Sequence, residues 1–207
     1  MGLRSKFFAF TYDRFSKRSE EAGLAAMRRS LIGGASGDVL EIGGGTGANL
    51  GYYPPVESVT ITEPEPSMLK RLERKARDHD SQATVLRAPA EDLPFEDASF
   101  DTVVSTLVLC GVDDQPRAVR ELRRVLRPGG RLIFMEHVRS DDPRVAKMQD
   151  RMNPVNRFLV CCDCNRPTLE TIRSAGFEVT ELEQTELPKA PPFVRPLIVG
   201  SATVPVA

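Results

Sequence analysis

The sequence contains no tryptophan, only two histidines and almost no net charge, because 28 Lys and Arg residues oppose 29 Asp and Glu residues. A nearly neutral chain produces no long-range field that would attract a phosphate backbone, so we do not expect nucleic acid as a partner. No run of about 18 apolar residues occurs, which predicts no membrane span. No secretory signal is evident either, so we expect a cytoplasmic protein.

Cysteine is also scarce, with Cys110 standing alone and Cys161, Cys162 and Cys164 forming a short cluster. In a reducing compartment these side chains are expected to be free thiols. Cys161-x-x-Cys164 has half of a zinc-binding spacing, but structural zinc takes four ligands and no second pair follows. We therefore predict no metal site.

What the sequence does contain is an alternation of short apolar runs with amphipathic helical patterns. Five runs indicate strands: Asp38–Ile42, Ser58–Thr62, Ala83–Arg87, Asp101–Leu109 and Arg131–His137. Helical periodicity covers Ser67–Asp78, Pro116–Arg127 and Thr168–Ala175. This alternation predicts an α/β fold whose mostly parallel sheet is covered on both faces.

The C-terminal part departs from that alternation. "FEVTELEQ" and "FVRPLIVGSATV" are two strand-like runs with no helix between them, joined by the proline-containing loop "TELPKAPP". We expect them to pair antiparallel at an edge of the sheet, which makes seven strands. Residues 1–36 indicate an N-terminal helical cap, and residues 140–167 a polar, irregular insertion. We treat residues 1–207 as a single domain.

The stretch "VLEIGGGTGANL" has four glycines in the five positions 43–47, directly behind the first expected strand. Loops between a strand and a following helix bind ligands in open α/β sheets, and free N–H groups together with the helix dipole favour polar or anionic atoms. Glu63 follows at the end of the second strand, where an acid accepts hydrogen bonds from ribose hydroxyls. A nucleoside ligand is favoured over a plain tight turn.

The loop alone does not decide between two nucleoside ligands. Gly43-x-Gly45-x-x-Ala48 fits a dinucleotide fingerprint, whereas Glu41-x-Gly43-x-Gly45-x-Gly47 resembles the first motif of class I S-adenosylmethionine-dependent methyltransferases. "TEPEPSML", "APAEDLPFEDASFDTVVS" and "ELRRVLRPGGRLIFMEHV" resemble further segments of that family. The terminal strand pair is similar to the hairpin of its doubly wound, Rossmann-like fold. Assignment as an NAD-dependent oxidoreductase explains neither these further segments nor the terminal strand pair, and it is the remote alternative.

Other segments resemble a narrower group. "GTGANLGYYPP", "TLVLCGVDDQ", "CNRPTLE" and "VRPLIVGSA" are similar to thiol S-methyltransferases, which are related to the quinone-biosynthesis methyltransferases. The resemblance implies an enzyme that uses S-adenosylmethionine to methylate a small molecule, in the first place a thiol. O- or C-methylation of a phenol or quinone-like precursor is the alternative.

The family resemblance also implies a set of cofactor-binding residues. They are Tyr12, Glu41, Gly43, Gly45, Gly47, Glu63, Pro64, Ala90, Glu91, Thr106 and Leu107. Ala90 and Glu91 would border the adenine, and Thr106 and Leu107 the methionine part. Tyr12 resembles an element that closes over the cofactor, or equally packs an N-terminal helix.

His137, at the end of the fifth expected strand, is the candidate catalytic residue. A thiol reacts as its thiolate, so a base or a thiolate-stabilising group is useful there. The alternative is a histidine that only packs at the end of the strand. Cys110 and Cys164 are predicted to line the acceptor pocket, although such cysteines often serve as small apolar fillers.

Overall fold

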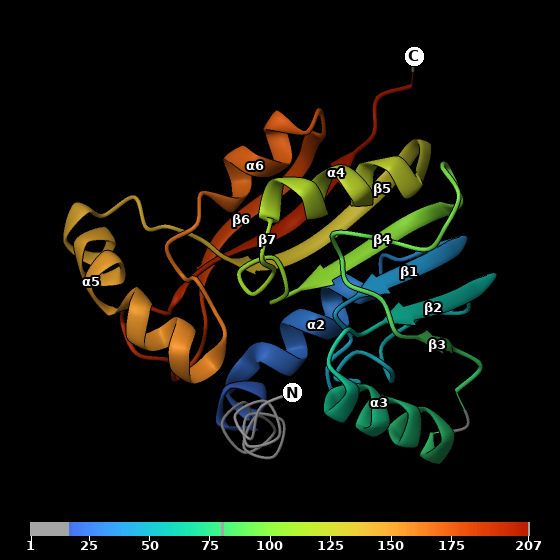
Figure 1. Cartoon of the computed structure of the whole chain (residues 1–207), viewed down its shortest axis with the longest axis horizontal. Coiled ribbons are helices and arrows are strands. Elements are labelled where there is room, and N and C mark those ends of the chain that lie inside the picture. Colours follow the sequence, from blue (N-terminus) through green and yellow to red (C-terminus); the bar gives the residue numbers. More distant parts are fainter. Residues whose placement is uncertain (1–16, 80, 207) are drawn as a thin grey trace.

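The computed structural model describes residues 17–79 and 81–206, so the predicted cofactor residue Tyr12 lies outside the described residues. Its centre is a seven-stranded sheet in the order β3-β2-β1-β4-β5-β7-β6 (Figure 1). The strands are β1 (Asp38–Ile42), β2 (Ser58–Thr62), β3 (Thr84–Leu86), β4 (Phe100–Thr106), β5 (Leu126–His137), β6 (Glu178–Glu186) and β7 (Pro196–Thr203).

Pairing confirms the expected sheet. β3, β2, β1, β4 and β5 pair in parallel, whereas β7 lies antiparallel between β5 and β6. Parallel neighbours require a crossover, but two consecutive strands joined by a loop can pair directly in opposite directions. The predicted doubly wound fold with an antiparallel C-terminal pair is therefore confirmed.

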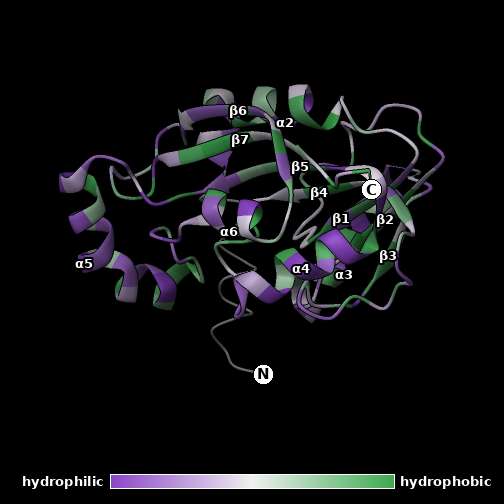
Figure 2. Cartoon of the chain, turned by 90° about the horizontal axis from the view of Figure 1, so that it is seen from above, coloured by the Kyte–Doolittle hydropathy of each residue, from purple (hydrophilic) through white to green (hydrophobic). Residues whose placement is uncertain are grey.

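Helices cover both faces of the sheet. On one face, η1 (Glu20–Leu24) and α2 (Ala25–Ile32) lie against the sheet, with Ile32 packed in one cluster with Val104 and Ile133. On the other face, α4 (Gln115–Val125) and α6 (Thr168–Ser174) pack on Val103 and Leu132. Figure 2 shows α2 on one side of the sheet and α4 and α6 on the other. The side chains of successive strand residues thus point into opposite layers, which is why these strands are apolar throughout.

Three helices share one start signal, an acidic N-cap followed by proline, which is already fixed near helical φ. The Glu65 carboxylate accepts from the amide of Ser67 at the start of α3 (Pro66–Asp78). Asp114 caps α4 in the same way, and Asp142 caps α5 (Pro143–Val160). These acids also complement the positive end of the helix dipole.

One expectation is corrected by α5. Residues 140–167 were expected to be irregular, but Pro143–Val160 form a helix of 18 residues. The Asp142 cap begins this helix, and its interior contains no glycine, while Pro154 lies within it. Figure 1 shows α5 at the left, beyond the carboxyl ends of β4 and β5, and it exposes Phe158 and Leu159.

A second correction concerns the segment after β1. The glycine loop was expected to lead into a helix, but residues 45–52 form consecutive turns and residues 53–57 continue as irregular chain to β2. Gly47, Gly51 and the pair Pro54-Pro55 explain this, because both residue types disfavour helix interiors. The dipole of a following helix therefore contributes nothing at this loop. Among the described residues, no helix is long and apolar enough to cross a bilayer.

Gly200 provides a test of the antiparallel pairing. A Cβ added at Gly200 would lie 2.1 Å from the carbonyl oxygen of Glu181 on β6. We expect Gly200→Ala to lower stability by about 1–3 kcal/mol, because backbone cannot move aside cheaply. Thermal unfolding followed by circular dichroism measures this. Gly51→Ala is the control, since an added Cβ there meets nothing within 4 Å. Equal unfolding midpoints for the two variants would contradict the register.

Candidate active site

The predicted site residues gather at one edge of the sheet. β1, β2, β4 and β5 run in parallel, so their carboxyl ends lie side by side. The glycine loop follows β1, Glu63 follows β2, Thr106 ends β4 and His137 ends β5. This is the edge at which open α/β sheets bind ligands.

The loop requires glycine at three positions because its backbone is left-handed there. Gly43, Gly45 and Gly47 have φ of +57°, +58° and +81°. A Cβ added at Gly43 would lie 2.6 Å from Cγ1 of Val108, in the loop after β4. At Gly43 both conformation and space therefore disfavour a side chain, whereas at Gly45, where an added Cβ meets only the carbonyl oxygen of Gly43 at 3.9 Å, conformation alone does so.

Glu63 connects the glycine loop to β2. Its carboxylate accepts hydrogen bonds from the amides of Gly45 and Glu65, both at 2.8 Å. Burial raises the pKa of Glu63, although these two amides oppose the shift. A buried acceptor at this place is suited to the hydroxyls of a ribose.

Glu41, in β1, holds the segment after the glycine loop through hydrogen bonds. Its buried carboxylate accepts from Asn49 Nδ2 at 2.9 Å and from the hydroxyl of Tyr53. Burial raises the pKa of Glu41, and the hydrogen bonds from Tyr53 and Asn49 lower it in part. Both oxygens are therefore engaged by the segment that they hold in place, and contact of Glu41 with a cofactor stays a prediction.

Sequence reasoning missed Arg28, which is only 3% exposed on α2. Its guanidinium donates to Asn49 Oδ1 at 3.1 Å and Thr106 Oγ1 at 3.0 Å, and it pairs with Glu20 at 3.0 Å. The sequence contained a signal for burial of Arg28, because Leu24, Arg28 and Ile32 recur every four residues on one buried face. A charged residue in an apolar stripe indicates a buried polar network.

The predicted adenine border is attached to the loop after β4. Ala90 is buried, and the Glu91 carboxylate accepts from the amides of Asp113 and Asp114 at 2.7 and 3.3 Å. Pro64 is exposed, and its carbonyl accepts from Arg87 Nε at 3.2 Å. Contact of these residues with an adenine remains a prediction.

The chain leaves β4 through a strained turn. Leu107 has φ of +61°, an uncommon conformation for a residue with a side chain. The buried carboxylate of Glu136 holds the turn by accepting from the amides of Val108 and Leu109, each at 3.0 Å. It also accepts from Ser105 Oγ at 2.6 Å. This is why β4 ends at Thr106, three residues earlier than expected.

Beyond that turn lies a cluster of Cys110, His137 and Cys162. The sulfurs of Cys110 and Cys162 lie 3.5 and 3.4 Å from Nδ1 of His137, and all three residues are buried. Nε2 of His137 has no hydrogen-bond partner among the described residues. Sequence reasoning grouped Cys162 with Cys161 and Cys164 as wall residues of the acceptor pocket and did not place it beside His137.

The cluster is electrostatically coupled. A hydrogen bond from Cys110, and then His137, lowers the pKa of Cys162 well below its usual value. The same hydrogen bond and burial raise the pKa of Cys110. Burial lowers the pKa of His137, but nearby Cys162 and Glu136 outweigh it and leave the pKa raised. Cys162 is therefore the thiol in this cluster that ionises most readily.

Segment 161–166 is held against the loop after β4. The amide of Asp163 donates to the carbonyl of Cys110 at 2.8 Å, and Asn156 donates to the carbonyl of Cys162 at 2.7 Å. Cys164, predicted to line the acceptor pocket, is fully buried in the same apolar cluster as Cys110 and Cys162. The sequence prediction thus placed Cys110 and Cys164 together, whereas Cys161 is exposed.

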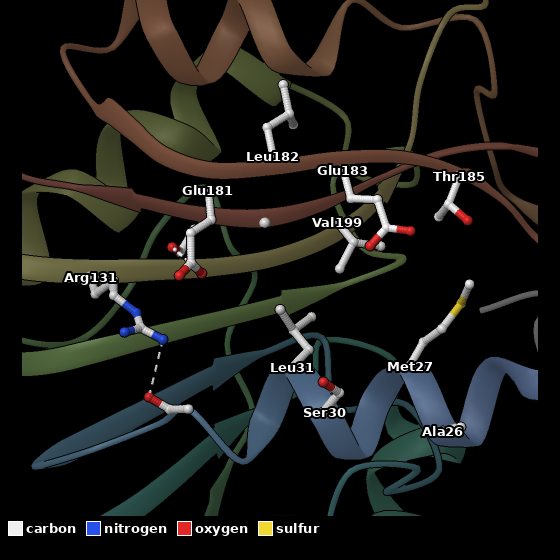
Figure 3. A pocket seen from close by; sticks show the side chains of 13 residues that line it. Ala26, Met27, Ser30, Leu31, Arg131, Glu181, Leu182, Glu183, Thr185 and Val199 are labelled. Atoms are coloured by element: carbon white, nitrogen blue, oxygen red, sulfur yellow. Dashed lines mark hydrogen bonds between the residues drawn. The ribbon is translucent and has the colours of Figure 1, made fainter.

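A separate cavity of about 700 Å³ lies between α2 and strands β6 and β7 (Figure 3). Met27, Leu31, Glu181 and Glu183 line it, and Arg131 reaches across to the carbonyl of Gly34 at 3.2 Å. None of the predicted site residues within 17–79 and 81–206 borders this cavity. The chemistry-bearing groups lie instead at the carboxyl edge.

Comparison with known proteins agrees with this geometry. A family model described as a methyltransferase domain matches residues 40–134, the span from β1 through most of β5. Thiol S-methyltransferase TMT1A of Homo sapiens is 34% identical over 210 residues, covering 95% of this chain and 86% of the relative.

Two further similarities bear on the acceptor and the fold. The ubiquinone/menaquinone biosynthesis C-methyltransferase UbiE of Hahella chejuensis is 38% identical over 156 residues, covering 72% of this chain and 56% of the relative. The crystal structure of a Thermotoga maritima protein described as an S-adenosylmethionine-dependent methyltransferase, possibly acting on histamine, superposes with a TM-score of 0.73. It covers 99% of this chain at 23% identity, which supports the fold alone.

Arg28 offers a test of the buried network. Arg28→Met should lower the free energy of unfolding by about 3–5 kcal/mol, because it leaves buried polar partners without their cation. Chemical denaturation measures this loss. Arg29→Met is the matched control on the same helix, since Arg29 is exposed and only lies over the Tyr52 ring. Similar losses in both variants would contradict a structural role for Arg28.

Proposed function

This chain belongs to the class I S-adenosylmethionine-dependent methyltransferase family, and from that premise we propose that it methylates the sulfur of a small thiol. It is an enzyme that transfers a methyl group, and its cofactor is S-adenosylmethionine. The dehydrogenase alternative is not supported, because the antiparallel strand pair and the matched domain both belong to methyltransferases.

Donor binding is assigned to the loop after β1 and the ends of β2 and β4. Gly45 leaves room for the ligand beside the backbone, because an added Cβ there meets only the carbonyl oxygen of Gly43 at 3.9 Å. Gly43 and Gly47 shape the loop, and Glu63 accepts from the ribose hydroxyls. Thr106 and Leu107 border the methionine part of the donor. The strained turn at Leu107 supports this proposal, because uncommon backbone conformations concentrate at functional sites.

Acceptor binding is assigned to the cluster beyond that turn. Methyl transfer from a sulfonium is an in-line displacement, so the enzyme must align acceptor and methyl carbon at about 3–3.5 Å and exclude water. The observation that carries a thiol acceptor is the buried His137, whose imidazole lies among sulfurs at the carboxyl end of β5. His137 favours the thiolate form of the acceptor, and Cys110 and Cys164 border the acceptor.

Similarity supports the same acceptor class. The relatives that cover most of this chain are named thiol S-methyltransferases, at 34% and 39% identity. The C-methyltransferases of quinone biosynthesis match a shorter part of the chain. A carbon acceptor on a phenol or quinone-like ring is therefore the second candidate.

Glu63 tests donor binding. Glu63→Ala should weaken S-adenosylhomocysteine binding about 10- to 100-fold, the effect of losing a buried, charged hydrogen-bond acceptor. Isothermal calorimetry measures the affinity. Glu57→Ala is the control, because that acidic side chain is exposed on the loop before β2. Unchanged affinity in Glu63→Ala would remove Glu63 from the donor site.

An acceptor panel tests the reaction. Small aliphatic and aromatic thiols, phenols and quinone precursors are supplied in parallel, with S-adenosylhomocysteine release and product mass as readouts. We expect the thiols to be methylated, and His137→Gln to lower kcat about 10²- to 10⁴-fold with unchanged affinity for S-adenosylhomocysteine. Methylation of the ring compounds alone would establish the second candidate instead.

A further inference from the structure

Cys110, His137 and Cys162 form a compact group of potential metal ligands, the one such group found in the part of the chain that the structure describes. The two sulfurs and the imidazole nitrogen all lie within 4.8 Å of one another. They come from three separate places in the sequence, namely the loop after β4, the end of β5 and the segment after α5. No local motif brings them together.

Nδ1 of His137 can form a hydrogen bond to only one of the two sulfurs at a time. Nδ1 of His137 has either one proton or one lone pair, yet it lies 3.5 Å from the Cys110 sulfur and 3.4 Å from the Cys162 sulfur. Tetrahedral zinc with Zn–S of about 2.3 Å and Zn–N of about 2.0–2.1 Å places sulfur and nitrogen about 3.6 Å apart. The two observed distances therefore match two edges of a zinc tetrahedron.

We propose that Cys110, His137 and Cys162 bind a zinc ion whose fourth position receives the sulfur of the acceptor. Three protein ligands with one open position is the arrangement of catalytic zinc, and two cysteines with one histidine is one of its known ligand sets. The acceptor part of this inference rests on the proposed thiol methylation. It gives His137 a definite role, as a ligand that holds the thiolate through the metal and not as a base.

Among the described residues, none adds a fourth ligand to this group. Cys164 lies in the same apolar cluster, but its sulfur is directed to Asn153 Oδ1 at 3.9 Å and does not belong to the compact group. Glu136 precedes His137, but its carboxylate is occupied by Ser105, Val108 and Leu109.

Rigid backbone contacts hold the three ligands before any ion binds. The carbonyl of Cys110 accepts from the amide of Asp163, and that of Cys162 accepts from Asn156. The carbonyl of His137 accepts from the hydroxyl of Thr168 at 3.0 Å. These contacts fix the backbone of the three ligand residues, and the imidazole ring itself is oriented by its packing, because Nε2 of His137 has no hydrogen-bond partner among the described residues.

The cluster also lies close to the proposed donor. Val108, two residues before Cys110, approaches Gly43 so closely that a Cβ on Gly43 would be 2.6 Å from its Cγ1. A sulfur bound beside Cys110 is thus near the ligand of the glycine loop. On binding zinc, the acceptor thiol releases its proton to water. Its sulfur then forms a bond to the donor methyl carbon while the sulfonium C–S bond breaks, which leaves S-adenosylhomocysteine and a methyl thioether.

Cobalt(II) provides a spectroscopic test on the full chain after treatment with a chelator. We expect one cobalt ion per chain, with sulfur-to-cobalt charge-transfer bands, and its displacement by zinc, in line with the usual order of affinities. Cys110→Ser, Cys162→Ser and His137→Gln should each weaken binding at least tenfold. Cys161→Ser is the matched control, because Cys161 is exposed next to Cys162.

Binding of S-adenosylhomocysteine to each variant verifies that it is folded, so loss of cobalt reports on the ligands. Absence of the bands in the wild-type chain, or equal binding by Cys162→Ser and Cys161→Ser, would overturn the site. Adding 2-mercaptoethanol should shift the bands if an acceptor sulfur is the fourth ligand, and an unchanged spectrum would overturn that part. Thiol methylation without bound metal refutes the zinc site alone, whereas bound metal without thiol methylation refutes the proposed acceptor.

Discussion

The buried carboxylate of Glu136 is the interaction on which both halves of the site depend. It lies within β5, where burial raises its pKa, and it binds the backbone amides of the turn that follows β4. This turn brings Val108 against Gly43 and places Cys110 beside His137. One charged group in the core therefore positions the loop between the donor side and the acceptor side.

The two sides are built differently. The donor side uses strand ends and glycine backbone, and its acids Glu41 and Glu63 are engaged with the loop that they support. The acceptor side depends on segment 161–166, which is locked to the loop after β4 by Asp163 and Arg166.

Much of the fold, and the residues of the proposed donor site, could be identified from local signals in the sequence. Glu41, Gly43, Gly45 and Gly47 stand in one loop, and Glu63 follows the next strand at a characteristic distance. The helix in residues 143–160 and the missing helix after β1 could not be assigned in this way. In the first the capping acid outweighed an irregular-looking composition, and in the second glycine and proline outweighed the usual crossover.

By itself, the sequence determined the order of elements, the antiparallel strand pair and the class of cofactor, since periodicity, turn residues and spaced motifs act over short distances. Only the tertiary structure brought Arg28 to Asn49 and Thr106, and Cys110 and Cys162 to one nitrogen of His137. These residues are separated by up to 78 positions along the chain. Their proximity follows from parallel strands that end at one edge of the sheet, and a pattern in the linear sequence does not describe that edge.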